Sequence, residues 1–237
     1  MHIAKDYDDR KAEFLDTAMR LFIERGYDET SVNAIIDAVG VSKGAFYHYF
    51  KTKDELLDEL AARAGEQAMA IVEPIVADAT LAAIPKLNLM FARTNSFKAQ
   101  NRELIVTLTR VFYSDRNALL RSRMTRRSVE LTAPALARII DQGNREGTMD
   151  VAHPAQTAAM ILEFGATVVA GFARRLGELA DDPAVGDELI LSMQVYTESV
   201  ERMLGVEPGS LTIVDDSIVR IVRGDTTESN GGTDDRS

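Results

Sequence analysis

One short stretch of the chain concentrates side chains that can contact the phosphates and base edges of DNA. Lys43 can reach a guanine edge or a phosphate, and Tyr47 can donate a hydrogen bond to the sugar–phosphate backbone. Gly44 and Ala45 are small and leave room for a duplex to approach. His48 follows on the same predicted helix, which exposes Lys43, Gly44, Tyr47 and His48. The chemistry that these residues support is recognition of nucleic acid rather than bond making.

The charge of the chain has to be judged by region, because the whole is acidic. There are 27 Lys and Arg against 37 Asp and Glu, which gives a formal net charge of −10. Such a total disfavours nucleic acid as a partner, since neutralisation of phosphates drives binding. No acid occurs between residues 38 and 53, however, where Lys43, Lys51 and Lys53 stand. A locally basic face on an acidic protein favours a DNA-binding protein that binds only a few specific sites. Sequence-independent DNA binding is the weaker alternative.

Catalytic and metal sites have little support in the sequence. The chain has no cysteine, which excludes thiol catalysis, disulfides and cysteine-based zinc sites, and its three histidines, His2, His48 and His153, are scattered. Gly40 to Gly44 match the G-x-S-x-G nucleophile elbow of α/β hydrolases, but that motif needs a preceding strand, and a helix is predicted there. We therefore predict no catalytic residue, no metal and no cofactor.

Two short helices have to position the DNA-binding side chains. Thr30 or Ser31 can cap a helix over about 31–39, Gly40 suits a left-handed turn, and Ser42 can cap a helix over about 42–49. The apolar contacts that lock the pair would come from Ala34, Ile35, Val39, Val41 and Phe46. The second helix would be about 10 Å long and could enter a major groove about 12 Å wide. The pattern predicts a helix-turn-helix; a plain helical hairpin with a solvated face is the alternative.

The segment from Phe14 to Leu57 resembles the DNA-binding domain of the TetR family of bacterial transcriptional repressors. The matching stretches are AMRLFIERGY at 18–27, TSVNAI at 30–35 and VGVSKGAFYHYFKTKDEL at 39–56. The resemblance implies that Ser31 and Asn33 touch the operator backbone or a base edge. It implies that the groove is faced by Lys43, Gly44 and Ala45. It assigns phosphate contacts to Ser42, Tyr47, His48 and Lys53.

The rest of the chain is also predicted to be helical, which makes the protein all-α. After a long helix from residue 54 towards 72, helices are expected over about 80–98, 101–114, 117–143, 154–179 and 184–204. We predict a helix-turn-helix domain over 8–55 and a larger helical domain over 56–204. They are followed by an extension over 205–223 with a short amphipathic helix in its later part, 211–223, and a disordered tail over 224–237.

The family resemblance also implies roles for the larger domain. It would bind a small molecule and form a homodimer through its last two long helices, here about 154–179 and 184–204. Residues 154–173 could span a bilayer by length, but Gln156 and Glu163 count against this, and no secretory signal is evident. We therefore expect a cytoplasmic protein that does not contact a membrane.

A ligand pocket would need apolar side chains with a few polar groups on the core helices. The candidates are Phe91, Asn95, Phe112, Tyr113, Met160, Phe164 and Phe172. More of them are expected to be ordinary core residues than ligand contacts, because such apolar stripes are usually simply buried.

The sequence thus predicts a homodimeric repressor that a small-molecule effector releases from DNA. Two-fold symmetry predicts a palindromic operator with half-site centres about 34–36 Å apart. The effector would shift the helix that starts at Asp54 and move the two reading helices out of register. The alternative is a helical small-molecule-binding protein or enzyme in which the helix-turn-helix is only scaffold.

Overall fold

The computed structural model describes residues 2–100, 109, 112–175, 178, 182–216, 219 and 222, and within these ranges it contains helices and no strand. The elements are α1 (His2–Arg25), α2 (Val32–Val39), α3 (Lys43–Tyr49), α4 (Lys53–Ala77), α5 (Ala83–Gln100), the 3-10 turn η1 (Asp115–Asn117), α7 (Ala118–Glu146), α8 (Pro154–Arg175) and α9 (Pro183–Leu204). The predicted all-α fold is confirmed. Most of the helix expected over 101–114 and the tail expected over 224–237 lie outside the described residues.

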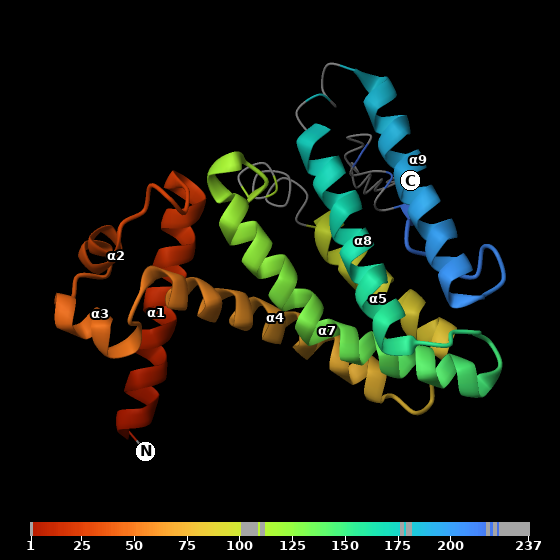
Figure 1. Ribbon diagram of the computed structural model, residues 1–237, viewed down its shortest axis with the longest axis horizontal. Coiled ribbons are helices and arrows are strands. Elements are labelled where there is room, and N and C mark those ends of the chain that lie inside the picture. The colour runs from red at the N-terminus through yellow and green to blue at the C-terminus, as the bar shows by residue number, and fades with distance from the viewer. Residues whose placement is uncertain are drawn as a thin grey trace, which may run out of the picture.

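A small N-terminal domain forms one end of the molecule. Helices α1, α2 and α3 and the start of α4 surround a core of fully buried side chains that includes Phe14, Phe22, Ile35, Phe46 and Phe50. Figure 1 shows this unit at one end of the long helix α4, which continues into the larger domain. Helix α4 therefore runs from one core into the other.

The larger domain is built on the pairing of α4 with α7, against which α5 and α8 pack. Helix α4 extends beyond the predicted end near residue 72 and continues to Ala77 with Pro74 inside it. A proline interrupts one backbone hydrogen bond of a helix. Here the following residues Ile75 and Val76 are both buried, Val76 in the core of the larger domain, and this burial stabilises the last turn.

Helices α8 and α9 pack on each other at the side of the larger domain that is remote from α1 to α3 (Figure 1). The buried Tyr196 hydroxyl of α9 donates a hydrogen bond to the Ile161 carbonyl of α8 at 3.0 Å, and burial raises the pKa of Tyr196 to about 12. A Cβ at Gly165 would lie 2.8 Å from the Tyr196 hydroxyl, so glycine permits this close approach. By length and composition, α8 could also cross a membrane, and little of its apolar stretch is buried within the chain.

The segment after α9 is a strap that returns along the larger domain, and we call residues 205–216 the C-terminal strap. Its residues 211–215 are not helical, so the predicted helix over 211–223 does not begin at its predicted start; helical geometry first occurs at Asp216. The reason is that side chains bind its backbone. Asn88 accepts a hydrogen bond from Thr212 N and donates one to Ser210 O, both at 2.9 Å. Asn95 donates to the carbonyl of Ile213 at 3.0 Å.

Glu201 is the buried anchor of the C-terminal strap, and its removal is expected to destabilise the larger domain. Its side chain is 4% exposed, and Oε1 accepts hydrogen bonds from Gly209 N at 2.9 Å and Leu211 N at 3.0 Å. Bonds to a charged acceptor contribute about 1.5–3 kcal/mol. Glu201→Ala should therefore lower the free energy of unfolding by about 2 kcal/mol in urea denaturation. Glu198→Ala, on the exposed side of α9, is the control; equal losses in both variants would contradict this role.

Candidate DNA interface and effector cavity

The turn between α2 and α3 is fixed by two serine caps and one glycine. Ser31 Oγ accepts a hydrogen bond from Ala34 N at 3.0 Å, and Ser42 Oγ accepts one from Ala45 N at 3.3 Å. Gly40 has φ of 76°, a left-handed conformation that an L side chain rarely adopts, and its N–H bonds to Ile36 O at 3.0 Å. The predicted bounds and caps of both helices are confirmed.

Helix α3 buries one face and exposes the other. Phe46 is fully buried and meets Phe14 edge to face, with ring centroids 5.7 Å apart. Lys43, Gly44 and Tyr47 lie on the exposed face, and Tyr47 is 47% exposed. The Lys43 ammonium lies 5.9 Å from the centroid of the Tyr47 ring, so a cation and a hydroxyl stand one helical turn apart.

The other residues predicted to contact DNA flank this face in different environments. Ser31, Asn33, Ser42 and His48 are exposed, whereas Ala45 is partly buried. A serine hydroxyl that accepts a capping bond still has its own hydrogen to donate. The two cap serines can therefore hold a helix end and a phosphate at the same time.

Lys53 is already engaged within the protein. Its ammonium donates hydrogen bonds to the carbonyls of Tyr27 at 2.9 Å and Thr30 at 3.1 Å, and it lies 4.2 Å from the centroid of the Tyr27 ring. The side chain is partly buried. The structure thus shows Lys53 holding the loop between α1 and α2, with at most one of its three donors left for a phosphate.

The G-x-S-x-G match has no hydrolase geometry. Helix α2, and not a strand, precedes Gly40, and the hydroxyl of Ser42 caps α3. Within the described residues no group of three or more His, Cys, Asp or Glu side chains is placed to hold a metal ion.

The N-terminal domain is joined to the larger domain at the start of α7. Tyr27 N donates hydrogen bonds to Asn117 Oδ1 at 3.1 Å and to Arg116 O at 3.3 Å, and Asn117 is fully buried. Leu120, one turn later, is fully buried in the core of the N-terminal domain. An ideal Cβ at Gly26 would lie only 2.9 Å from Arg116 Cβ.

An ionic cluster reinforces this joint. Arg123 of α7 bonds to Asp58 at 2.6 Å and lies 3.8 Å from Asp54, both on α4. Asp54 also accepts a hydrogen bond from the Tyr27 hydroxyl. Burial, together with the bond to Asp54, raises the pKa of Tyr27 well above its ordinary value. Tyr27 and the starts of α4 and α7 are therefore tied together.

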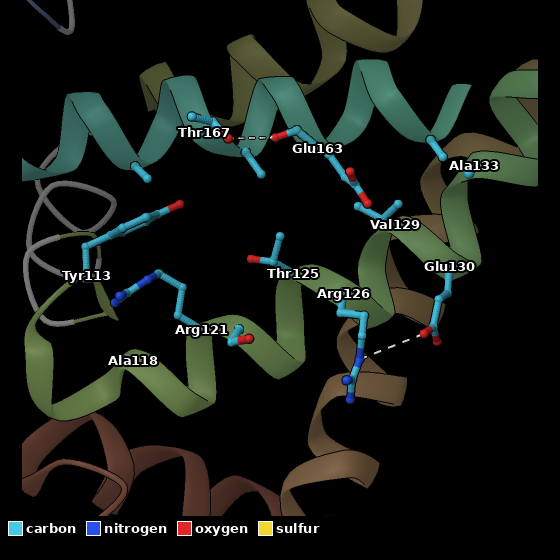
Figure 2. Close-up of a pocket in the computed structure, with 14 residues that line it drawn as sticks. Tyr113, Ala118, Arg121, Thr125, Arg126, Val129, Glu130, Ala133, Glu163 and Thr167 are labelled. Carbon is cyan, nitrogen blue, oxygen red and sulfur yellow. Dashed lines mark hydrogen bonds and ion pairs between the residues drawn. The ribbon is translucent and has the colours of Figure 1, made fainter. Parts of the chain in front are cut away.

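A cavity of about 700 Å³ lies between α7 and α8 of the larger domain. Figure 2 shows Tyr113 and Arg121 at one end, Thr125 beside the gap, and Glu163 extending from α8 towards Val129. Small side chains form much of the remaining wall: Ala118, Ala133, Ala159, Ala166 and Ala170. The cavity therefore combines small apolar side chains with polar and charged groups, of which Tyr113 and Arg121 mark one end.

Arg121 is held at its end of the cavity by the protein backbone. Its Nη1 donates hydrogen bonds to Phe112 O at 3.1 Å and Ser114 O at 3.3 Å, and its guanidinium stacks 5.2 Å from the centroid of the Tyr113 ring. Burial raises the pKa of Tyr113, and the neighbouring Arg121 partly opposes that shift. This end of the cavity offers a hydroxyl and a fixed cation.

The seven residues predicted to line a ligand pocket lie in different parts of the structure. Tyr113 borders the cavity, and Asn95 binds the C-terminal strap. Met160 and Phe164 are exposed on α8. The other three pack in hydrophobic clusters: Phe91, Phe112 and Phe172.

Several residues at the candidate DNA interface, the joint and the cavity were not predicted from the sequence. Thr125 had no distinguishing pattern, and Asn117 contacts a partner 90 residues away in the chain. Arg121 stands in a run of five arginines over residues 116–127, a pattern that is more typical of a solvated helix face than of a ligand site. Tyr7 had a usable signal, because it precedes the core residue Phe14 by two helical turns and shares its face.

Comparison with known families matches one part of the chain. Residues 14–60 match the family described as bacterial regulatory proteins, tetR family. The HTH-type transcriptional repressor Rv1474c of Mycobacterium tuberculosis is 40% identical over 62 residues, which cover 26% of this chain and 33% of that protein. The repressor KstR2 of Rhodococcus jostii is 45% identical over 51 residues, or 22% of this chain and 25% of that protein. The matches thus span a third or less of these relatives.

Comparison with solved structures extends over most of the chain. The transcriptional regulator FadR of Bacillus subtilis, in complex with stearoyl-CoA, aligns with a TM-score of 0.56 at 22% identity, covering 80% of this chain and 97% of that one. A TetR-family regulator of Pectobacterium atrosepticum gives a TM-score of 0.56 at 20% identity, covering 84% and 96%. The larger domain therefore shares the fold of these regulators.

Proposed function

Because its N-terminal domain belongs to the tetR family of bacterial regulatory proteins, we propose that this chain is a transcriptional repressor that binds a palindromic operator as a homodimer and is released by a small-molecule effector. The observation that carries the proposal is the exposed face of α3. Lys43, Gly44 and Tyr47 stand together on a helix whose other face is locked in the core, without an acid between residues 38 and 53.

Dimerisation through α8 and α9 is supported by their exposed apolar side chains. Among the described residues, five large apolar side chains at least 37% exposed lie on these two helices: Met160, Phe164, Val169, Leu191 and Val195. Two antiparallel helices with such faces can form a four-helix bundle with a second copy. A second copy packed on α8 would also explain why this apolar helix is little buried within the single chain, so no membrane is needed to cover it. The protein would then act on DNA in the cytoplasm.

The cavity between α7 and α8 is the proposed effector site. An amphiphile suits it, with the apolar part along the alanines and the polar end at Tyr113 and Arg121. The structurally similar FadR holds stearoyl-CoA, which is an amphiphile. The stretch from η1 into the start of α7 borders the cavity with Ala118 and Arg121 and contacts the N-terminal domain through Asn117 and Leu120. An effector that moves this stretch would reorient α3.

Release of DNA by a bound compound tests the ligand response. We expect an amphiphile from a panel that includes fatty acids and acyl-CoA thioesters to raise the melting temperature, because a ligand that binds the folded state stabilises it. The same compound should release a labelled operator duplex. Ala166→Phe, which places a large side chain from the wall into the cavity, should abolish both effects. A compound that acts equally on the Ala166→Phe variant would place the effector elsewhere.

Leu191→Glu should convert the dimer into a monomer at micromolar concentration, because a carboxylate on the apolar face of α9 would have to be desolvated in the bundle. Leu191 is 58% exposed in the single chain. Ile71→Glu is the matched control, since Ile71 is 54% exposed but lies on α4. Light scattering measures the mass; equal masses for wild type and Leu191→Glu would contradict the proposed interface.

A further inference from the structure

The ring of Tyr7 packs against the exposed end of α3, beside the proposed phosphate contacts. Its centroid lies 4.6 Å from that of Tyr49 and 5.8 Å from that of His48. Tyr7 precedes Phe14 by two helical turns, so both rings stand on the same face of α1. Phe14 is fully buried and also contacts Tyr49, with centroids 5.6 Å apart. Tyr7 therefore extends the core stripe of α1 to the surface of α3, alongside which α1 passes in Figure 1.

Two rings meet the exposed His48 imidazole at steep angles. The interplanar angle is 82° with Tyr7 and 84° with Tyr49, whose centroid is 5.2 Å away. Edge-to-face contacts of this kind favour one ring orientation over others. A side chain that is already ordered loses less conformational freedom when it meets a ligand. Tyr7 is 39% exposed, so its removal leaves the buried core in place.

We propose that Tyr7 is a positioning residue for DNA binding, whose ring holds the His48 imidazole in the orientation in which it meets a backbone phosphate. This inference rests on the proposed function, because it requires α3 to lie against DNA. It assigns a role to a residue that lies before the matched family segment, 14–60.

Fluorescence anisotropy with a duplex that the wild-type dimer selects from a random library tests this role. Tyr7→Ala should weaken binding about fivefold, the effect of leaving one side chain unordered. Tyr7→Phe should stay within about twofold, because the ring and not the hydroxyl positions His48. In a His48→Ala background, Tyr7→Ala should have no further effect, since the group that it positions is gone.

Three results would overturn the positioning role: wild-type affinity in Tyr7→Ala, equal losses in Tyr7→Phe and Tyr7→Ala, or additive losses in the double variant. The second would mean that the hydroxyl itself contacts DNA. If Tyr7→Ala lowers the melting temperature, Tyr7→Leu replaces it in the test, because leucine keeps the apolar contact of α1 but has no aromatic ring. Tyr7→Leu should show the same loss of affinity as Tyr7→Ala. If the wild-type protein enriches no duplex, the proposed function itself is contradicted. If it does enrich one and the Tyr7 variants behave otherwise than expected, only the positioning role is contradicted.

Discussion

Gly44→Glu is expected to weaken specific DNA binding about a thousandfold while the protein stays folded. Gly44 is exposed on α3, and an ideal Cβ there meets only Ser42 Oγ at 3.9 Å, an ordinary contact. An acid in the first turn of a helix is also favourable for the helix. The new carboxylate would face the phosphates and fill the space that the duplex needs. Like charges at an interface cost several kcal/mol, and about 4 kcal/mol corresponds to this loss.

A matched variant separates the effect of a carboxylate at this position from the general effect of one added negative charge. Ala79→Glu adds the same carboxylate at an exposed site in the turn between α4 and α5, remote from the N-terminal domain. Its affinity for the selected duplex should stay within about twofold of wild type, since distant exposed charges are screened. Melting temperatures of both variants report the fold. Wild-type affinity in Gly44→Glu would show that α3 does not approach DNA by this face.

Gly26→Ala is expected to lower the free energy of unfolding by about 3 kcal/mol, because two penalties coincide. Gly26 has φ of 98°, in the region that L side chains rarely adopt. The added methyl would also lie 2.9 Å from Arg116 Cβ. Arg116 would have to move, and its carbonyl accepts a hydrogen bond from Tyr27 N in the joint between the domains. Urea denaturation measures the loss.

Gly147→Ala isolates the backbone part of this effect. Gly147 has a similar positive φ of 69°, but an added Cβ there has no neighbour within 4 Å. It should lose only about 1–2 kcal/mol, the cost of the left-handed conformation. Gly26→Ala should additionally weaken DNA binding, since the joint sets how the reading helix is held. Equal losses of stability in the two variants would contradict tight packing at the joint.

The helix-turn-helix was predictable because its determinants are local. The caps at Ser31 and Ser42 and the turn at Gly40 each act within a few residues, so spacing alone places them. Lys53 illustrates the limit of such reasoning. Its carbonyl partners on Tyr27 and Thr30 lie 26 and 23 residues away in the chain. A sequence pattern shows that a lysine is present, but not which acceptors elsewhere in the fold its ammonium group binds.

The cavity proposed to hold the effector was hardly predictable, for a physical reason. Aromatic residues on core helices mostly fill space, as Phe91 and Phe112 do, whereas the cavity is lined by five alanines together with polar and charged side chains. A cavity forms where side chains are too small to fill the gap between helices, and that gap depends on the packing of α7 against α8. The conformation of the C-terminal strap was likewise decided by side chains outside it, Asn88 of α5 and Glu201 of α9, rather than by its own amphipathic pattern.

The ratio of affinities for the selected duplex and for random DNA, at one salt concentration near 0.15 M, tests the central claim most directly. Specific regulators bind their sites about 10³–10⁷ times more tightly than other DNA. The exposed face of α3 on an acidic body predicts a ratio of at least about a thousand, carried by a two-fold symmetric site. A ratio near one, with no symmetric sequence enriched, would contradict the assignment of this chain as a sequence-specific regulator.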